Sequence, residues 1–513
     1  MTKAMLTPRS AFALRNLSLL AALATTSGSL SADTPTARPR PTCSGCGASR
    51  PVRDGCWRQL TDIVVSPETG LVIFTGSHTV TAGGYPTQDT EHELVALDLE
   101  TGQVAWSASD PSPGFWGHPY RLQLTANPER LLTQTNTNSP VARDPSSGDL
   151  LWMMPYWEGT EAREAPAKFD PESITVAHCF ALDSDDHESI AQWSLFVRAI
   201  DVRTGDLAWA RHVELPEFAD FTSPGEGPHV GKPVKVGGLA VIFAEMTVSE
   251  GSSPSNLLVA LSLSDGSVRW RLHLDDLSND AWPWIVASPD GRSFYRVDNT
   301  NVVEPTETYL TAYDAAEGYL FWRQRVPMPE TPEDRVHHFL VSPSGRCIAL
   351  VAGEYPPVWV ELDRPIAPIV LSGFDARTGK LLWHHQLTPA HHLSASPTLT
   401  FSEDDAVFFA IPTIWLADGA FLEQDTQVVA LSPAGTERWR VDSVAKWLGA
   451  PLRCRDNGIP RIATAGGVTA VILAYEDEHK ASHWGALGLD ATGGAPLWRS
   501  IFPVVADEHT PKT

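Results

Sequence analysis

Short apolar stretches recur along the chain and are separated by Asp, Gly, Ser and Pro. The residues before Asp98, Asp201 and Asp375 are mostly apolar and have the pattern of β-strands. Between such stretches lie SPETG (residues 66–70), SPDGR (288–292) and SPSGR (342–346). Proline fits the first position of a turn and glycine a later one, so these segments predict hairpins. The pattern predicts an all-β fold.

One hairpin is repeated. It reads ALDLETGQVAW at residues 96–106, AIDVRTGDLAW at 199–209 and GFDARTGKLLW at 373–383. Weaker copies end at five further tryptophans, namely Trp152, Trp270, Trp322, Trp439 and Trp498. Trp106 and Trp498 lie 392 residues apart in seven steps, a mean of 56 residues. A period of that length suits a unit of four short strands.

Each part of the repeat has a physical role in a hairpin. The Asp side chain can accept backbone N–H bonds across the turn, and Gly adopts a positive φ without steric cost. Two hairpins per unit give four strands, and such units arranged around an axis are the blades of a β-propeller. We therefore predict a single eight-bladed β-propeller of four-stranded antiparallel blades over residues 57–513, with seven blades as the alternative. No second domain and no helix longer than about three turns is expected.

The Asp-x-x-x-Thr-Gly-x-x-x-Trp hairpin resembles the tryptophan-docking repeat of the quinoprotein-like (PQQ-repeat) propellers. These include the pyrroloquinoline-quinone dehydrogenases and the propeller lipoprotein of the outer-membrane β-barrel assembly machinery. The resemblance covers about residues 57–500, and two of the weaker copies depart from it by carrying Ser262 and Ser432 in place of Asp. It implies that eight tryptophans pack between neighbouring blades: Trp106, Trp152, Trp209, Trp270, Trp322, Trp383, Trp439 and Trp498.

The resemblance leaves function open, because the family contains both enzymes and non-catalytic scaffolds. In the catalytic relatives it implies an adjacent Cys-Cys pair over the quinone, a calcium ion held by carboxylate and amide oxygens, and an Asp base. No two of the six cysteines are neighbours here, and no segment reproduces the calcium motif. The leading hypothesis is an exported, non-catalytic scaffold that binds a protein partner or a ligand. The alternative is a quinone-dependent oxidoreductase that uses pyrroloquinoline quinone and calcium in the central channel.

Other motifs for chemistry are weak. The loop at residues 225–232 lacks phosphate-loop spacing, because Glu226 stands where glycine is needed and Pro233 follows Lys232. The acidic residues between Asp183 and Glu188 fit either a calcium site or a solvated hairpin tip. Three histidine pairs occur, at 337–338, 384–385 and 391–392. On a strand the two side chains of each pair would point to opposite faces, so they would not chelate one ion.

A set of polar residues is predicted to meet at one mouth of the channel. Counting back four residues from the Ser-Pro turns places Asp62, Trp284 and His338 at the same point of three inner strands, and a looser alignment adds Lys232 and Arg461. Inner strands line the channel of a propeller. Aromatic, imidazole and cationic groups there would suit a small anionic or polar ligand. The competing interpretation is an ordinary polar channel lining.

Composition and charge limit the classes of partner that the protein is expected to bind. Hydrophobic residues make up 42% of the 513 residues and charged residues 19%, enough apolar material for a sizeable core. The 62 acidic and 38 basic residues give a formal charge of −24, which repels phosphate backbones and anionic lipid surfaces. Nucleic acid is therefore not expected as a partner. The charge favours basic or cation-bridged partners.

The first residues have the features of a secretory signal. Lys3, Arg9 and Arg15 precede a short apolar run at residues 17–23, followed by small residues. We predict a signal peptide over residues 1–32, a Cys- and Pro-rich extended tether over 33–56, and a periplasmic or secreted protein. Removal of the signal would change the charge from −24 to −27, because it contains three basic and no acidic residues. No stretch reaches the roughly 20 apolar residues of a membrane span.

The six cysteines favour disulfides in an exported chain. A haem attachment at Cys43 and Cys46 would need a following His, but the next residue is Gly47. A zinc site there lacks a fourth ligand at suitable spacing. Of the 15 possible full pairings, we favour Cys56 with Cys454 and Cys43 with Cys46. Cys179 and Cys347 would remain as buried thiols.

The Cys56–Cys454 disulfide is testable. Closing the ring places the first and eighth blades side by side, and both cysteines directly precede an inner strand. The bond would close a loop of 398 residues and add roughly 4–5 kcal/mol of stability in the chain-entropy model. Peptide mapping without reductant should recover the two cysteines joined. Recovery of Cys56 bound to Cys43 or Cys46, or as a free thiol, would exclude this pairing.

Overall fold

The computed structural model describes residues 57–503 apart from seventeen short segments and three single positions. These are 83–84, 111–121, 127, 135–139, 154–173, 184–191, 216–228, 231–232, 247–254, 275–284, 301–306, 330–333, 355–365, 367, 390–391, 394, 418–420, 450–451, 454–458 and 477–481. All described residues belong to one unit of the chain, Arg53–Thr513. The predicted signal peptide and tether lie outside the described residues.

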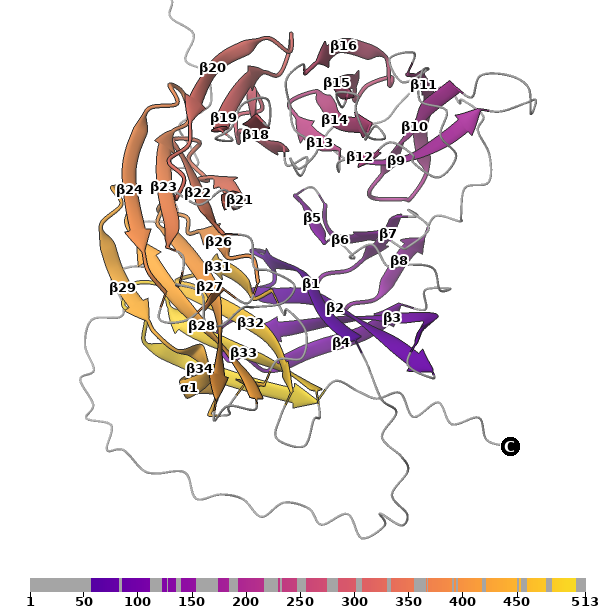
Figure 1. Cartoon of the computed structure of the whole chain (residues 1–513). Coiled ribbons are helices and arrows are strands. Elements are labelled where there is room, and N and C mark those ends of the chain that lie inside the picture. Colours follow the sequence, from indigo (N-terminus) through magenta and orange to yellow (C-terminus); the bar gives the residue numbers. More distant parts are fainter. Residues whose placement is uncertain are drawn as a thin grey trace, which may run out of the picture. The chain divides into compact units, whose positions relative to one another are not determined.

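The first four blades follow one another in chain order (Figure 1). Blade 1 contains β1 (Trp57–Ser66), β2 (Leu71–Ala82), β3 (Tyr85–Asp98) and β4 (Val104–Asp110). Blade 2 contains β5 (Gln123–Ala126), β6 (Glu129–Gln134), β7 (Pro140–Arg143) and β8 (Leu150–Met153). Blade 3 contains β9 (Ile174–Asp183), β10 (Gln192–Asp201) and β11 (Leu207–Glu214). Blade 4 contains β12 (His229–Val230), β13 (Val234–Val236), β14 (Leu239–Met246), β15 (Ser255–Ser262) and β16 (Val268–His273).

The second half has the same design. Blade 5 contains β17 (Ile285–Ala287), β18 (Ser293–Thr300), β19 (Glu307–Asp314) and β20 (Leu320–Arg325). Blade 6 contains β21 (Asp334–Val341), β22 (Cys347–Glu354), β23 (Ile369–Asp375) and β24 (Leu381–Leu387). Blade 7 contains β25 (His392–Leu393), β26 (Thr398–Phe401), β27 (Val407–Ala417), β28 (Phe421–Leu431) and β29 (Glu437–Val441). Blade 8 contains β30 (Leu452–Arg453), β31 (Arg461–Ala465), β32 (Val468–Glu476), β33 (Ser482–Asp490) and β34 (Pro496–Pro503).

The predicted all-β fold, with antiparallel blades in a ring, is confirmed. The described strands form seven hydrogen-bonded sheets that together contain eight docking hairpins. The two numbers differ because β30 pairs with both β28 and β32 and so joins blades 7 and 8 into one sheet. The structure therefore has eight blades when docking hairpins are counted and seven when hydrogen-bonded sheets are counted.

The repeated hairpin folds as its residue types require. Asp98 accepts hydrogen bonds from the backbone N–H and the hydroxyl of Thr101 at 2.8 and 2.7 Å. Gly102 then adopts a φ of +69° and donates its N–H to the Asp98 carbonyl. The bonds from the Thr101 hydroxyl and N–H lower the pKa of Asp98. The turn is thus built by local bonds that the motif alone specifies.

Each motif tryptophan lies against the glycine turn of the next blade. A Cβ at Gly266 would lie 2.6 Å from the ring of Trp209, so no larger residue fits. Trp209 also donates its indole N–H to the carbonyl of Leu263 at 2.8 Å. Seven of the eight indoles make the equivalent bond, at 2.7–3.2 Å, and Trp322 lies against Gly379 in the same manner.

A small residue stands opposite each of these tryptophans. The strand partner is alanine for six of them and glycine for Trp383 and Trp498. A Cβ on Gly373 would come within 2.1 Å of the Trp383 ring. A register shift follows this pair in every hairpin. The small partner and the bulge together leave room for the indole beside its own hairpin.

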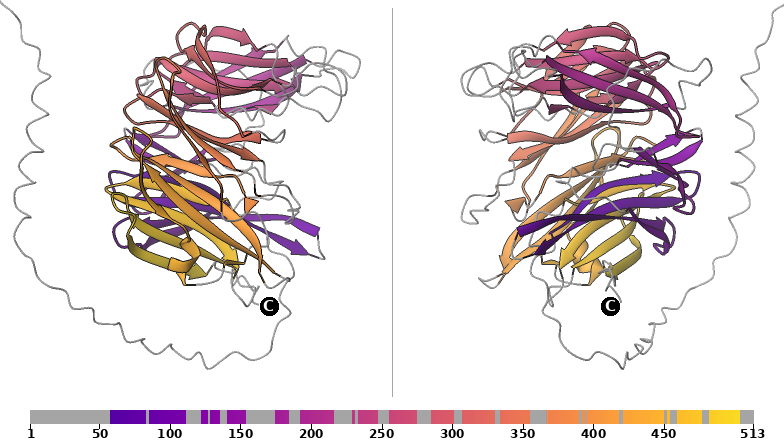
Figure 2. Two further views of the ribbon diagram at one scale, coloured as in Figure 1. Left: turned by 60° about the vertical axis from the view of Figure 1, so that its left-hand side comes forward. Right: turned by 90° about the vertical axis from the view of Figure 1, so that its right-hand side faces the viewer.

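The same contact closes the ring between the last and first blades. Trp498 on β34 donates to the carbonyl of Leu99 in blade 1 at 2.7 Å, and its ring lies against Gly102. The inner strand β31 of blade 8 also contacts β1. The first and last blades accordingly lie side by side in both views of Figure 2, in indigo and yellow. Buried residues from these two blades share one cluster that includes Phe74, Ile472 and Trp484.

The described residues contain one short α-helix. Helix α1 (Val444–Leu448) lies between blades 7 and 8, begins at the N-cap Ser443 and ends at Gly449, which has a φ of +75°. Val444 and Leu448 are buried against both blades, whereas Trp447 is 43% exposed. Within the part of the chain that the structure describes, no helix is long and apolar enough to cross a bilayer.

The docking contact predicts a large loss of stability for Trp209→Ala. Trp209 is fully buried, so its removal leaves a cavity between blades 3 and 4 and should cost about 3–5 kcal/mol. The free energy of unfolding, measured by chemical denaturation, tests this value.

Trp447→Ala is the matched control. This tryptophan is exposed on α1 and contacts no glycine turn that the structure describes, so its loss should change stability by less than about 0.5 kcal/mol. Equal losses for the two variants would show that interblade docking does not set the stability of the ring.

Candidate functional site

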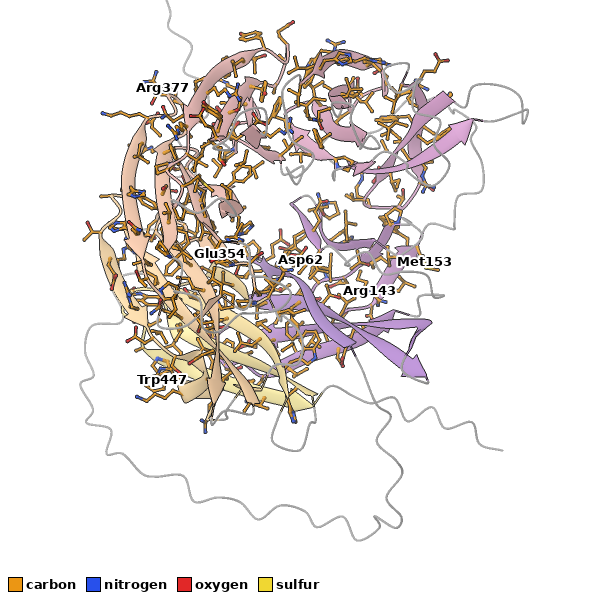
Figure 3. The ribbon with its side chains drawn as sticks, in the orientation of Figure 1. Asp62, Arg143, Met153, Glu354, Arg377 and Trp447 are labelled. Carbon is orange, nitrogen blue, oxygen red and sulfur yellow. The ribbon has the colours of Figure 1, made fainter. Side chains whose placement is uncertain are left out.

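The structure describes three of the five residues predicted at the channel mouth. Asp62 lies on β1, His338 on β21, and Arg461 is the first residue of β31. Asp62 and His338 occupy equivalent positions, since each directly follows a register shift in the pairing of its inner strand with the second strand. Lys232 and Trp284 lie outside the described residues. In Figure 3, Asp62 lies near the inner ends of the strands, whereas Met153, Arg377 and Trp447 lie at the periphery.

Asp62 and His338 connect neighbouring inner strands. Asp62 Oδ2 accepts the backbone N–H of Leu122, in blade 2, at 2.9 Å. His338 Nδ1 accepts the backbone N–H of Leu399, on β26 of blade 7, at 3.0 Å. Two different side chains thus make the same bond to the next blade. Asp62 and His338, which the sequence aligned by their distance from the Ser-Pro turns, therefore share an interblade hydrogen bond.

A similar bond continues from blade 7 to blade 8. Thr398 on β26 donates its hydroxyl to the carbonyl of Pro460, the residue before Arg461, at 3.0 Å. Polar bonds of this kind link the inner strands of neighbouring blades.

His338 is an uncharged acceptor in this arrangement. Burial among the inner strands, together with the positive charge of Arg461, lowers the pKa of His338 to about 3. With Nδ1 accepting a hydrogen bond, the neutral ring carries its proton on Nε2. Arg461 is therefore close enough for its charge to act on His338. Whether a ligand binds at the predicted channel mouth stays a prediction.

The other paired histidines that the structure describes each lie against a different neighbour. His337 is buried, and its Nδ1 lies 3.3 Å from the hydroxyl of Ser396. On β24 the His384 side chain is exposed, and His385 Nε2 bonds the carbonyl of Gly435. His391 and the side chain of His392 lie outside the described residues.

Most of the predicted cysteine and calcium sites lie outside the described residues. These are Cys43, Cys46, Cys56 and Cys454, the side chain of Cys179, and the acidic residues 183–188. Cys347 is a free thiol, 5% exposed, and burial raises its pKa to about 12. A thiol of that kind is unreactive at neutral pH. Among the described residues, no three His, Cys, Asp or Glu side chains are placed to hold a metal ion.

Sequence reasoning missed a buried ion pair in blade 5. Arg296 is fully buried, with its Nε 3.1 Å from Asp298 Oδ1, and its guanidinium lies 4.3 Å from the centre of the Phe243 ring in blade 4. Thr311 donates its hydroxyl to the other oxygen of Asp298 at 2.6 Å. The pair fixes blade 5 against blade 4. Arginine and aspartate are usually exposed, so no signal in the sequence identified the pair.

Asp405 is a second feature that the sequence did not predict. It has a φ of +61°, the only positive value at a non-glycine residue in the described part of the chain. Its carboxylate accepts the backbone N–H and the hydroxyl of Ser344, in the corresponding turn of blade 6. The equivalent turns carry Gly291 and Gly345, both with positive φ. Asp405 therefore adopts a strained conformation, and its carboxylate bonds the turn of blade 6.

Exposed apolar residues gather on the outer strands. Blade 2 contributes Leu150, Leu151 and Met153, and blade 5 contributes Tyr319, Leu320 and Phe321. Further examples lie on the outer strands of other blades, namely Val104, Val268, Leu381, Leu382, Leu497 and Ile501. Exposed apolar patches on folded domains are typical of interaction surfaces.

The sequence matches one family model repeatedly. A PQQ-repeat model, described as outer membrane protein assembly factor BamB, matches residues 194–341, 254–409 and 367–500. Together the matches extend over residues 194–500, more than half of the chain. No curated protein matches the sequence.

Solved structures resemble the chain at low identity. BamB from Moraxella catarrhalis is 13% identical, with 73% of this chain and 83% of that chain covered and a TM-score of 0.35. The quinohemoprotein alcohol dehydrogenase ADHIIG from Pseudomonas putida HK5 is 11% identical, with 82% and 72% covered and a TM-score of 0.38. The WD40 domain of SCAP from fission yeast is 10% identical, with 86% and 96% covered and a TM-score of 0.42.

The depressed pKa of His338 predicts a pH dependence of stability. In the unfolded chain the ring takes up a proton below about pH 6.5, whereas in the fold it stays neutral until about pH 3. Its contribution to stability is therefore complete above pH 6.5 and falls as the pH drops toward 3. The slope should reach up to about 1.4 kcal/mol per pH unit. Denaturation midpoints between pH 7 and 4 measure it.

His338→Asn isolates this contribution, because the amide oxygen can accept the Leu399 N–H but takes up no proton. The variant should show a flatter pH dependence than the natural protein. His384→Asn, which changes an exposed ring on the same blade, should leave the slope unchanged. An unaltered slope in His338→Asn would show that this ring titrates alike in the folded and unfolded chains.

Proposed function

Because the chain belongs to the family of PQQ-repeat β-propellers described as outer membrane protein assembly factor BamB, we propose that it is an exported, non-catalytic scaffold that binds another protein in the cell envelope. The family description names a protein assembly factor. A protein of that kind acts by binding other proteins and needs no catalytic site.

The observation that carries the proposal is the division of side chains between the inner and outer strands. Toward the channel, Asp62, His338 and Thr398 use their polar atoms to bond the next blade. On the outer strands, several large apolar side chains are 37–60% exposed. The inner polar groups thus maintain the ring, and the exposed apolar surface is what remains for recognition.

The described residues do not fit a calcium-bound quinone. They offer no group of three metal-ligating side chains, and the carboxylate of Asp62 is already occupied by two backbone N–H groups, from Ile63 and Leu122. The sequence contains no adjacent cysteine pair. We therefore derive no catalytic step through a quinone and keep it as an outcome of the test below.

Export is part of the proposal. It is supported by the basic and apolar pattern of residues 1–32, and the family description places its namesake at the outer membrane. The mature protein would then lie in the periplasm or outside the cell, where its partner would be found.

The experiment uses the full chain in cells that naturally make it. Chemical cross-linking in intact cells, followed by fractionation, should recover the processed chain in the envelope or secreted fraction, joined to a protein partner in fixed proportion. The same purified protein is then incubated with pyrroloquinoline quinone and calcium and desalted. We expect neither quinone absorbance nor stoichiometric calcium to be retained.

Two results would overturn the proposal. One is retention of both quinone and calcium together with substrate-dependent reduction of an artificial electron acceptor, which would support the oxidoreductase. The other is a chain that keeps residues 1–32 and stays in the cytosolic fraction, which would exclude export.

A further inference from the structure

The outer strands of blades 4, 5 and 6 are sheet edges. In the described part of the chain β16, β20 and β24 each pair on one side only, with β15, β19 and β23 respectively. The other side of each strand presents backbone N–H and C=O groups without a strand partner. Such an edge is a template for an added strand unless the protein protects it.

Two of these three edges, β16 and β20, have a charge opposite to that of the whole chain, whereas β24 carries histidines but no Arg or Lys. Over 19 residues the three edges contain four arginines, three histidines and no Asp or Glu, whereas the whole chain has 62 acidic and 38 basic residues. The arginines are Arg269 and Arg271 on β16 and Arg323 and Arg325 on β20. The net charge of the chain favours basic partners, but this surface favours an acidic one.

Blade 5 adds exposed apolar residues to its basic edge. Tyr319, Leu320 and Phe321 are 55%, 53% and 47% exposed, and the rings of Tyr319 and Phe321 meet edge-on at 5.5 Å. None of the three is needed for docking, because Trp322 makes the contact with Gly379 of blade 6. Leu320 and Phe321 are thus exposed on the edge strand, directly after the exposed Tyr319.

The two arginines of β20 are held in defined positions beside these apolar residues. The Arg323 guanidinium lies 4.1 Å from the centre of the Tyr309 ring. Arg325 Nη1 lies 3.5 Å from Glu307 Oε1, while its side chain stays 63% exposed. A partner carboxylate would meet guanidinium groups that are already ordered, which lowers the entropy cost of pairing.

We propose that the outer edge of β20 binds an extended acidic segment of a partner protein, which adds to blade 5 as a further strand. The backbone edge supplies the hydrogen bonds, Leu320 and Phe321 cover apolar side chains of the segment, and Arg323 and Arg325 meet its carboxylates. The proposal rests on the proposed scaffold function and names the surface and the chemistry of its partner.

A role in edge protection alone does not explain the surface. Arginines on an edge discourage pairing with a second copy of the same strand, because like charges would face each other. Edge protection, however, is weakened by exposed apolar residues, and β20 has them at Leu320 and Phe321. The combination repels another copy of this chain and suits an acidic, partly apolar strand.

The probe is a blocked, fluorescently labelled peptide of eight residues that alternates valine and glutamate. A peptide that alternates valine and lysine is the matched control for charge. Fluorescence anisotropy with the full mature chain should show binding of the glutamate peptide, weakened by salt, and no binding of the lysine peptide. Amide hydrogen exchange should slow at residues 320–325 and not on the other outer strands.

Two variants test the residues, each with a control of the same kind. Leu320→Ser/Phe321→Ser and Arg323→Glu/Arg325→Glu should each weaken peptide binding by about tenfold or more. Leu497→Ser/Ile501→Ser on β34 and Arg438→Glu/Arg440→Glu on β29 make equal changes on other blades and should alter binding by less than about twofold. Circular dichroism and the thermal midpoint check that all four variants fold.

The proposal is wrong if the glutamate peptide does not bind, if it binds equally to the β20 variants, or if exchange slows elsewhere. It is also wrong if phosphatidylglycerol vesicles bind and lose binding in the same β20 variants, which would assign the surface to a membrane. The cross-linking experiment distinguishes failure of the β20 surface from failure of the scaffold function. A partner that is still captured by the β20 variants would leave the scaffold function standing and remove this surface from it.

Discussion

The fold depends on one contact repeated around the ring, an indole ring lying on a glycine turn of the next blade. Its geometry is demanding, because the turn glycine must have a positive φ, the strand partner must be alanine or glycine, and a bulge must follow. Each condition is local, yet the contact joins residues about 50 apart in sequence. The last copy joins Trp498 to Leu99, so a local motif becomes a closed architecture without a special closing element.

Outside this contact, polar side chains of different kinds form hydrogen bonds between some neighbouring blades. An aspartate, a histidine and a threonine serve the inner strands, and Asp405 serves the turns. Two of these residues, Asp62 and His338, are also among those that the sequence predicted at the channel mouth. Groups that accept backbone N–H bonds are the same groups that bind ligands, and only their partners distinguish the two roles.

The ring leaves its outer strands free to differ. Docking fixes the tryptophan and the turn before it, but it places no demand on the residues at the exposed edge. Blades 4 and 5 have basic edges in an acidic chain, and blade 5 adds apolar residues. A scaffold with a constant interior and variable edges can acquire a partner without cost to its stability, because binding and docking use different atoms of the same strands.

The sequence by itself determined the blades, since Asp98, Gly102 and Trp106 act through bonds within one hairpin and its nearest neighbour. It also identified Asp62 and His338 as equivalent, because both are fixed by distance from a local turn. The tertiary structure decided what those two residues do, since their partners Leu122 and Leu399 are about 60 residues away. It alone revealed the Arg296–Asp298 pair and the strained Asp405. Long-range burial and contacts between blades leave no periodic trace in the chain.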